Sequence, residues 1–214
     1  VLIQPDLGTS LVLGAILLGS LFFSGASLRW LTVLVLGVIA MIPVAWQFVL
    51  RDYQKQRLAS FLDPSADPLG AGYQLQQSQI TVGSGGLFGR GLTNSLAGQN
   101  LPVGSTDFVF AHVSEQLGFL GGSVLLALFA LLIWRVLNVG WRSGDTFTLA
   151  FSGGIAGMLL FQMIVNVGMV LGVMPITGLP LPFVTYGGAS LLSAALGLGI
   201  LESLAMSRSG SGQV

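Results

Sequence analysis

Charged residues are scarce in this 214-residue chain, at 7% of the sequence, and cysteine is absent. Soluble domains carry about 25% charged residues, so the composition excludes an ordinary soluble domain. The absence of cysteine excludes disulfides and thiolate metal sites. The formal net charge is zero, so the chain also lacks the basic signature of a nucleic-acid-binding protein.

The chain is instead rich in apolar residues, at 53%, and in glycine, with 31 residues. Its mean hydropathy is +0.85. In such a chain the bilayer takes the place of water around the protein, and small residues let neighbouring helices approach closely. The composition therefore predicts an all-α polytopic membrane protein.

Five apolar segments are long enough to cross a membrane, because about 20 helical residues span the hydrocarbon. Pro5 and Asp6 are suited to start the first helix, and Pro43 predicts a kink in the second. The segments cover residues 7–25, 30–50, 117–139 (in a helix that starts near residue 108), 147–170 and 182–206. A polar loop, 51–106, separates the second from the third, and a Gly/Ser tail, 207–214, is expected to be disordered.

Basic residues in the short loops predict the orientation of these spans. Arg29, Arg142 and Arg208 lie at ends that share one side of the membrane if each segment crosses once. The turn 172–181 has no basic residue. The side with the arginines is therefore expected to be cytoplasmic, and the loop 51–106 is expected to face outward.

The outer loop contains two recognisable stretches. Residues 70–78 predict a short amphipathic helix after a glycine turn, and residues 83–91 contain five glycines. Glycine-rich backbone can turn its N–H groups toward an anion. However, no strand precedes this stretch and no Gly-Lys-Ser/Thr follows it, so turn formation is the commoner explanation.

Several motifs occur in the order typical of one family of membrane proteins. They are 4–9 (QPDLGT), 72–74 with Gln77 and Ser78, 83–87 (GSGGL), 106–108 (TDF), Glu115, Gly118, 166–172 with 175–178, and 179–183 (LPLPF) leading to 186–188. On these residues, across nearly the whole chain, the sequence resembles the SEDS family (shape, elongation, division and sporulation). The run 166–178 is closer to the elongation branch than to the division branch.

The resemblance implies a fold of roughly ten transmembrane helices, of which about five would lie here. Residues 1–214 would then form the C-terminal half of one integral-membrane domain. The implied activity is peptidoglycan glycosyl transfer, which polymerises lipid II into glycan strands at the outer face of the bacterial cytoplasmic (inner) membrane during cell elongation. The implied partners are lipid II, a class B penicillin-binding protein, other rod-shape elongation proteins and membrane lipids, with no nucleic acid.

Glycosyl transfer needs a base for the acceptor hydroxyl and a way to stabilise the leaving group. Asp107 matches the essential acid of the family and is the expected general base, although it could also cap a helix starting at Phe108. Glu115 lies about 12 Å farther along that helix, beyond the roughly 6.5–9.5 Å between paired carboxylates in inverting hydrolases. It is expected either to line the substrate cavity or to be structural.

The pyrophosphate of the substrate needs cations. Arg90 is the better candidate, whereas Lys55 and Arg57 are more simply explained by attraction to anionic head groups. Asp6 could hold a divalent cation, Mg²⁺ or Mn²⁺, or could only cap the first helix. No organic cofactor is expected.

The remaining candidates for substrate binding follow from the matching motifs. Tyr186 and Ser190 would line a wall of the cavity, unless the glycines between them serve only close helix packing. His112 is expected to be a satisfied interior group instead of a base. Relatives of the resembled family usually carry an aliphatic residue at this position. The other candidates are Gln4, Gln74 and Gln77.

Two rival functions fit a chain of this kind, namely a lipid II transporter and a non-catalytic scaffold for the penicillin-binding protein. A transporter usually carries polar groups through the membrane midplane. Here the polar groups cluster at the outer side, and only Gln162, Asn166 and Glu202 stand out within the spans. This distribution favours chemistry at the outer face, for which a scaffold would have no use.

Overall fold

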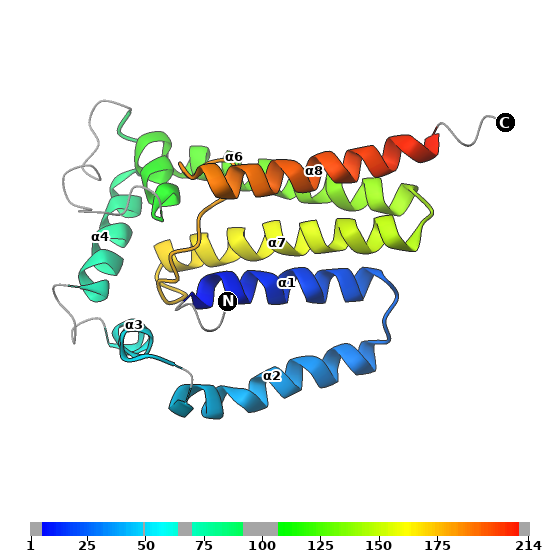
Figure 1. Ribbon diagram of the computed structural model, residues 1–214. Coiled ribbons are helices and arrows are strands. Elements are labelled where there is room, and N and C mark those ends of the chain that lie inside the picture. The colour runs from blue at the N-terminus through cyan, green and yellow to red at the C-terminus, as the bar shows by residue number, and fades with distance from the viewer. Residues whose placement is uncertain (1–5, 49, 64–69, 92–106, 210–214) are drawn as a thin grey trace. The chain divides into compact units, whose positions relative to one another are not determined.

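The computed structural model describes residues 6–48, 50–63, 70–91 and 107–209 (Figure 1). These residues form helices and turns, with no strand among them, so the all-α prediction is confirmed. In chain order the helices are α1 (Leu7–Phe23), α2 (Leu28–Phe48), α3 (Asp52–Leu62), α4 (Ala71–Ser84), α6 (Val109–Arg142), α7 (Thr146–Val170) and α8 (Gly188–Ser209).

The apolar helices match the predicted spans. Among the described residues, α2, α6, α7 and α8 are long and apolar enough to cross a membrane, and α1 is a shorter apolar helix. Pro43 lies inside α2, where only Leu31 is buried. A helix that is apolar on all sides and exposes most of its side chains suits a lipid environment.

The last span starts later than predicted, at Gly188 instead of residue 182. The chain before it closes a tight turn, in which the Leu181 N–H donates to Thr185 Oγ1 at 2.8 Å and the Thr185 N–H donates to the Leu181 carbonyl at 2.9 Å. Phe183 in this turn has a φ of 64°, in the left-handed region, so a right-handed helix cannot run through it. α8 also runs to Ser209, into the predicted tail, whose residues 210–214 lie outside the described part of the chain.

The polar loop predicted at 51–106 contains two helices. The expected amphipathic helix at 70–78 is confirmed as α4, which extends to Ser84. α3 was not predicted from the sequence. Its first turn contains Asp52, and the Arg51 N–H donates to Gln54 Oε1 at 2.9 Å, which satisfies a backbone group at the start of the helix.

The contacts of the chain divide it into two compact units. The first unit contains the described residues of Val1–Val49, Phe129–Phe161 and Gly188–Val214, and the second contains those of Leu50–Leu128 and Gln162–Gly187. α1, α2 and α8 lie in the first unit and α3 and α4 in the second, while α6 and α7 contribute residues to both.

Small residues bring α1 and α7 close together in the first unit. A Cβ added to Gly153 would lie 2.7 Å from the Gly19 carbonyl oxygen, and one added to Gly157 would lie 2.7 Å from the Ala15 carbonyl oxygen. Only glycine allows this approach, as expected for membrane helices. The buried core of this unit consists of Val136, Ile155, Ala156, Leu159 and Leu201.

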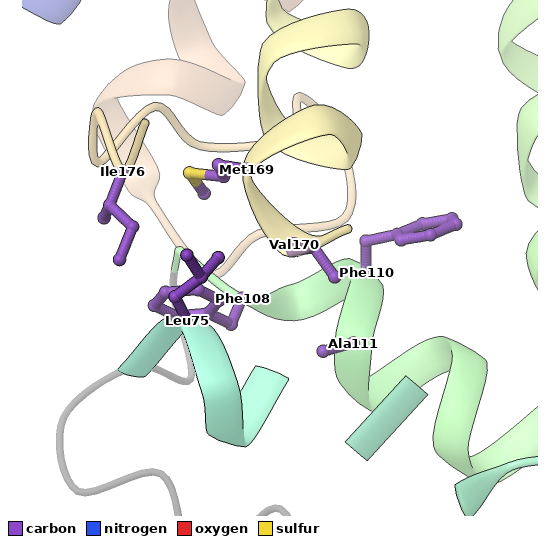
Figure 2. Packing of buried hydrophobic residues seen from close by; sticks show 7 residues of the cluster. All are labelled: Leu75, Phe108, Phe110, Ala111, Met169, Val170 and Ile176. Atoms are coloured by element: carbon purple, nitrogen blue, oxygen red, sulfur yellow. The ribbon is translucent and has the colours of Figure 1, made fainter. Parts of the chain in front are cut away.

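The core of the second unit joins α4, the start of α6, the end of α7 and the loop that follows. Figure 2 shows its buried residues, which are Leu75, Phe108, Phe110, Ala111, Met169, Val170 and Ile176. Burying one Leu or Phe side chain stabilises a fold by about 1.5–3 kcal/mol. Phe108 is only 2% exposed, and its burial helps to fix the position of Asp107 immediately before it.

Helix α6 is broken at Gly118, whose φ of 69° and ψ of −169° are not helical. In an uninterrupted helix the Glu115 carbonyl would accept from the Phe119 N–H, and the Gln116 carbonyl would accept from the Leu120 N–H. The break therefore requires other partners for four backbone groups, because an unpaired group at membrane depth costs several kcal/mol.

The glycine-rich loop 85–91 supplies all four partners. The bonds run from the Arg90 N–H to the Glu115 carbonyl (2.9 Å), from the Gly91 N–H to the Gln116 carbonyl (3.1 Å), from the Phe119 N–H to the Gly86 carbonyl (2.8 Å), and from the Leu120 N–H to the Leu87 carbonyl (3.2 Å). The loop thus replaces two helical hydrogen bonds with four of its own. The turn role expected of these glycines is confirmed, and the N–H groups of Arg90 and Gly91 are not available to an anion.

Gly85→Ala is expected to destabilise the protein by about 1–3 kcal/mol, as overpacking does. Gly85 already has ordinary helical dihedral angles, but its added Cβ would collide with the Ser114 carbonyl oxygen. Gly83→Ala is the matched control, since its Cβ would have no neighbour within 4 Å, and alanine favours a helix interior by about 1 kcal/mol. Thermal unfolding of the full-length protein in detergent would compare them, and equal midpoints would contradict the packing argument.

Candidate functional site

Asp107 lies in the turn that leads into α6, and its side chain is half-buried. The His112 N–H donates to the Phe108 carbonyl at 3.3 Å, so helical hydrogen bonding begins at Phe108 and not at Asp107. The N-cap position therefore belongs to Phe108. A Cβ added to Gly178 would lie 3.5 Å from Asp107 Oδ2, which puts the carboxyl group beside the loop 171–187.

The backbone of Asp107 is held by a side chain from α7. Asn166 Nδ2 donates to the Asp107 carbonyl at 2.9 Å and also to the Leu179 carbonyl at 2.8 Å. Asn166 has no exposed surface, and Leu179 is 4% exposed. One buried amide thus ties the start of α6 to the loop 171–187.

Side chains from α3 and α4 hold the same part of the chain. Arg57 Nη1 donates to the Ile176 carbonyl at 3.4 Å, Ser78 Oγ to the Val170 carbonyl at 3.0 Å, and Gln79 Nε2 to the Leu171 carbonyl at 3.2 Å. Leu181, near the far end of the loop, is fully buried. The loop is therefore a well-anchored wall beside Asp107, and Arg57 contributes to it as a structural donor.

Glu115 and His112 lie farther along α6. The Glu115 side chain has no exposed surface, so it is enclosed by the protein instead of lining an open surface of the described chain. His112 Nδ1 lies 3.2 Å from the Phe108 carbonyl. Because a carbonyl oxygen can only accept, this bond requires the proton on Nδ1. His112 is thus satisfied within its own helix, as predicted.

Arg90 is exposed, and its Nε donates to the Ser84 carbonyl at 3.2 Å. This bond orients the guanidinium group at the end of the glycine-rich loop. Gln74 and Gln77 are half-buried on α4, whereas Tyr186 is 95% exposed. These four residues belong to the second unit, as do Asp107 and Glu115.

Three predicted site residues lie elsewhere. Asp6 and the half-buried Ser190 belong to the first unit, and Gln4 lies outside the described residues. Within the residues that the structure describes, no group of three or more His, Asp or Glu side chains is placed to hold a metal ion.

Asp6 is the N-cap of α1. Its Oδ1 accepts from the Thr9 N–H at 3.0 Å, and its Oδ2 accepts from the Thr9 hydroxyl. The Thr9 hydroxyl, the Thr9 N–H and the Gly8 N–H together hold the pKa of Asp6 below its ordinary value of 3.8, against the opposing effect of partial burial. The capping role considered from the sequence is therefore present.

The cap of α1 is expected to weaken in acid. Because the pKa of Asp6 is lowered on folding, its stabilising effect is complete above pH 3.8 and is lost as the pH falls through the lower, folded pKa. Asp6→Asn can still accept the Thr9 N–H without titrating. The difference in unfolding midpoint between wild type and Asp6→Asn should therefore shrink between pH 6 and pH 3 in the full-length protein. A constant difference over that range would contradict the assignment.

The sequence did not single out Asn166 for the site. The sequence did contain a signal for it, namely a polar side chain within an apolar span, which usually faces a polar partner or interior. The sequence did not indicate which distant backbone groups Asn166 binds, because no local pattern predicts a contact between residues far apart in the chain.

Known proteins are similar to this chain over most of its length. The family model FTSW_RODA_SPOVE, described as "Cell cycle protein", matches residues 1–210. The chain belongs to this family. The resemblance to SEDS proteins is thereby confirmed over nearly the whole length of the sequence.

Two curated relatives illustrate the similarity of this family member. The chain is 46% identical over 203 residues to "Peptidoglycan glycosyltransferase MrdB" of Escherichia coli (strain K12). It is 39% identical over 202 residues to "Stage V sporulation protein E" of Bacillus subtilis (strain 168). In both cases the match covers 94% of the chain and 55% of the relative, so the chain spans about half of their length.

Solved structures agree with this assignment. One is a chain from a study of the structural coordination of polymerization and crosslinking by a peptidoglycan synthase complex, with a TM-score of 0.78 and 36% identity over 97% of this chain and 57% of that one. Another is the rod shape determining protein RodA of Thermus thermophilus, with a TM-score of 0.61 and 32% identity over 96% of this chain and 51% of that one.

Proposed function

We propose that the protein containing this chain is a peptidoglycan glycosyltransferase that polymerises lipid II, with Asp107 as its general base. The observation that carries the proposal is the half-buried Asp107 at the start of α6, whose backbone is held by Asn166 and whose carboxyl lies beside Gly178. Relatives named peptidoglycan glycosyltransferase support the reaction type.

In the proposed reaction, the Asp107 carboxylate accepts the proton of the acceptor sugar hydroxyl. The hydroxyl oxygen then forms a bond to the anomeric carbon of the donor sugar, and the bond from that carbon to the pyrophosphate oxygen breaks. The undecaprenyl pyrophosphate leaves with the bonding electrons, and the anomeric configuration inverts. A base within hydrogen-bond reach contributes about 10²–10⁴-fold to such a step.

The leaving group carries negative charge that needs a positive partner. Arg90 is the proposed partner, because it is exposed and oriented by its bond to Ser84. Mg²⁺ or Mn²⁺ is also proposed to share this role.

The proposed setting is the outer face of the bacterial cytoplasmic membrane, with the C-terminus in the cytoplasm. The loop arginines support this orientation. A class B penicillin-binding protein is the proposed partner, because a similar chain comes from a complex that coordinates polymerization with crosslinking. Polymerisation would then supply the strands that the partner crosslinks during cell elongation.

Asp107→Asn and Asp107→Ala are expected to abolish polymerisation while the protein remains folded and inserted in the membrane. The assay uses the full-length protein with its partner, labelled lipid II in detergent, and an inhibitor of the partner's transpeptidase. Detergent removes the two sides of a membrane, so transport alone gives no polymer. Near-normal polymer formation by either variant would rule out Asp107 as the base.

Arg90→Gln is expected to raise the KM for lipid II by about 10–100-fold, because a hydrogen bond to a charged group contributes about 1.5–3 kcal/mol. Arg29→Gln is the matched control, since it removes an exposed arginine from the start of α2, in the other unit. The same lipid II assay measures both variants. An equal KM for the two would show that Arg90 does not bind the pyrophosphate.

A further inference from the structure

The amide of Asn166 binds two segments that are distant in sequence. Its Nδ2 donates to the carbonyl of Asp107, 59 residues earlier, at 2.9 Å, and to the carbonyl of Leu179, 13 residues later, at 2.8 Å. Both hydrogens of the NH₂ group are thereby used. Because the side chain has no exposed surface, water does not compete for these bonds.

An amide buried in an apolar helix destabilises the fold unless its polar atoms form hydrogen bonds. Burying a polar group without a hydrogen bond costs roughly 1–3 kcal/mol by protein mutational data. In Asn166 only the NH₂ end is satisfied, because the buried Oδ1 has no hydrogen-bond partner among the residues that the structure describes. An apolar side chain of similar size would avoid this cost, so the benefit of Asn166 must come from its two donated bonds.

Both bonds act on the surroundings of Asp107, the proposed base. One fixes the backbone of Asp107 itself. The other fixes Leu179, directly after Gly178, where an added Cβ would lie 3.5 Å from Asp107 Oδ2. The Asn166 amide therefore fixes the backbone position from which the Asp107 side chain extends. It also fixes the segment 178–179, beside which the Asp107 carboxyl group lies.

We propose that Asn166 is a positioning residue for glycosyl transfer, which orients the Asp107 carboxylate by holding its backbone against the Gly178–Leu179 turn. The inference rests on the proposed function. A misplacement of about 1 Å in a catalytic group can cost on the order of 10²-fold in rate. Loss of the amide should therefore slow the chemical step while substrate binding remains.

The test uses the full-length protein with its partner in the lipid II assay. Asn166→Leu removes both donors at similar volume, and Asn166→Asp keeps the shape but replaces the NH₂ group with an oxygen. Gln162→Leu is the matched control, because Gln162 lies one turn earlier on α7, is buried, and also has an oxygen with no partner in the described part of the chain. Thermal unfolding in detergent gives the folded fraction to which each rate is normalised.

For both Asn166 variants, kcat per folded molecule is expected to fall by about 10–100-fold while KM changes by less than about threefold. Gln162→Leu should leave both constants unchanged, whatever its unfolding midpoint. If Asn166→Leu does not fold, Asn166→Asp decides the result at the same thresholds. Unchanged kcat per folded molecule, or a raised KM with unchanged kcat, would overturn the inference.

Asp107→Asn separates this inference from the proposed function. If Asp107→Asn polymerises normally, the general base is misassigned and the positioning role falls with it. If Asp107→Asn is inactive and the Asn166 variants keep their kcat, Asp107 remains the base and only the role of Asn166 is wrong.

Discussion

Backbone groups at membrane depth must find partners inside the protein, and the break in α6 is the place where this requirement shapes the second unit. In an uninterrupted helix, the backbone N–H and C=O groups form hydrogen bonds with one another. By breaking at Gly118, α6 becomes dependent on the loop 85–91, and the loop in turn connects α6 to α4. The exchanged bonds are all backbone bonds, and glycines at 85, 89 and 118 allow the two backbones to approach closely enough to form them. It holds the first turns of α6, and therefore the residues after Asp107, in a fixed register with α4.

A second set of bonds acts on the loop beside Asp107. Asn166, Arg57 and Gln79 all donate to carbonyl groups in or next to the loop 171–187. Irregular backbone of this kind offers carbonyls that no helix satisfies, so side-chain donors from three helices take their place. The acid thus lies beside an irregular segment that is held by hydrogen bonds instead of by regular secondary structure.

The sequence predicted the elements whose cause is local. The length of the apolar runs is enough to predict the spans. The helix at 70–78 is predicted by the amphipathic pattern of its own residues. The late start of α8 was missed because Phe183 adopts left-handed backbone, with a φ of 64°, that its residue type does not indicate. Asp107 was identified through the family motif, since its position before Phe108 equally suggested a cap. The bonds of Asn166 and the partners of the broken helix could not be predicted, because they join residues far apart in the chain.

The loop 85–91 also limits how sequences of this kind can vary. Its bonds to α6 attach at residues 86 and 87 on one side and at 90 and 91 on the other, so only two residues bridge the attachments. Of these two residues, Phe88 is 81% exposed, whereas Gly89 has a φ of 82° and an added Cβ would collide with the Gln116 carbonyl. One residue more or fewer would detach two helical groups from their partners, at several kcal/mol each. The number of residues in this loop and its glycines at 85 and 89 should therefore be conserved, while the exposed side chains of Leu87 and Phe88 can vary.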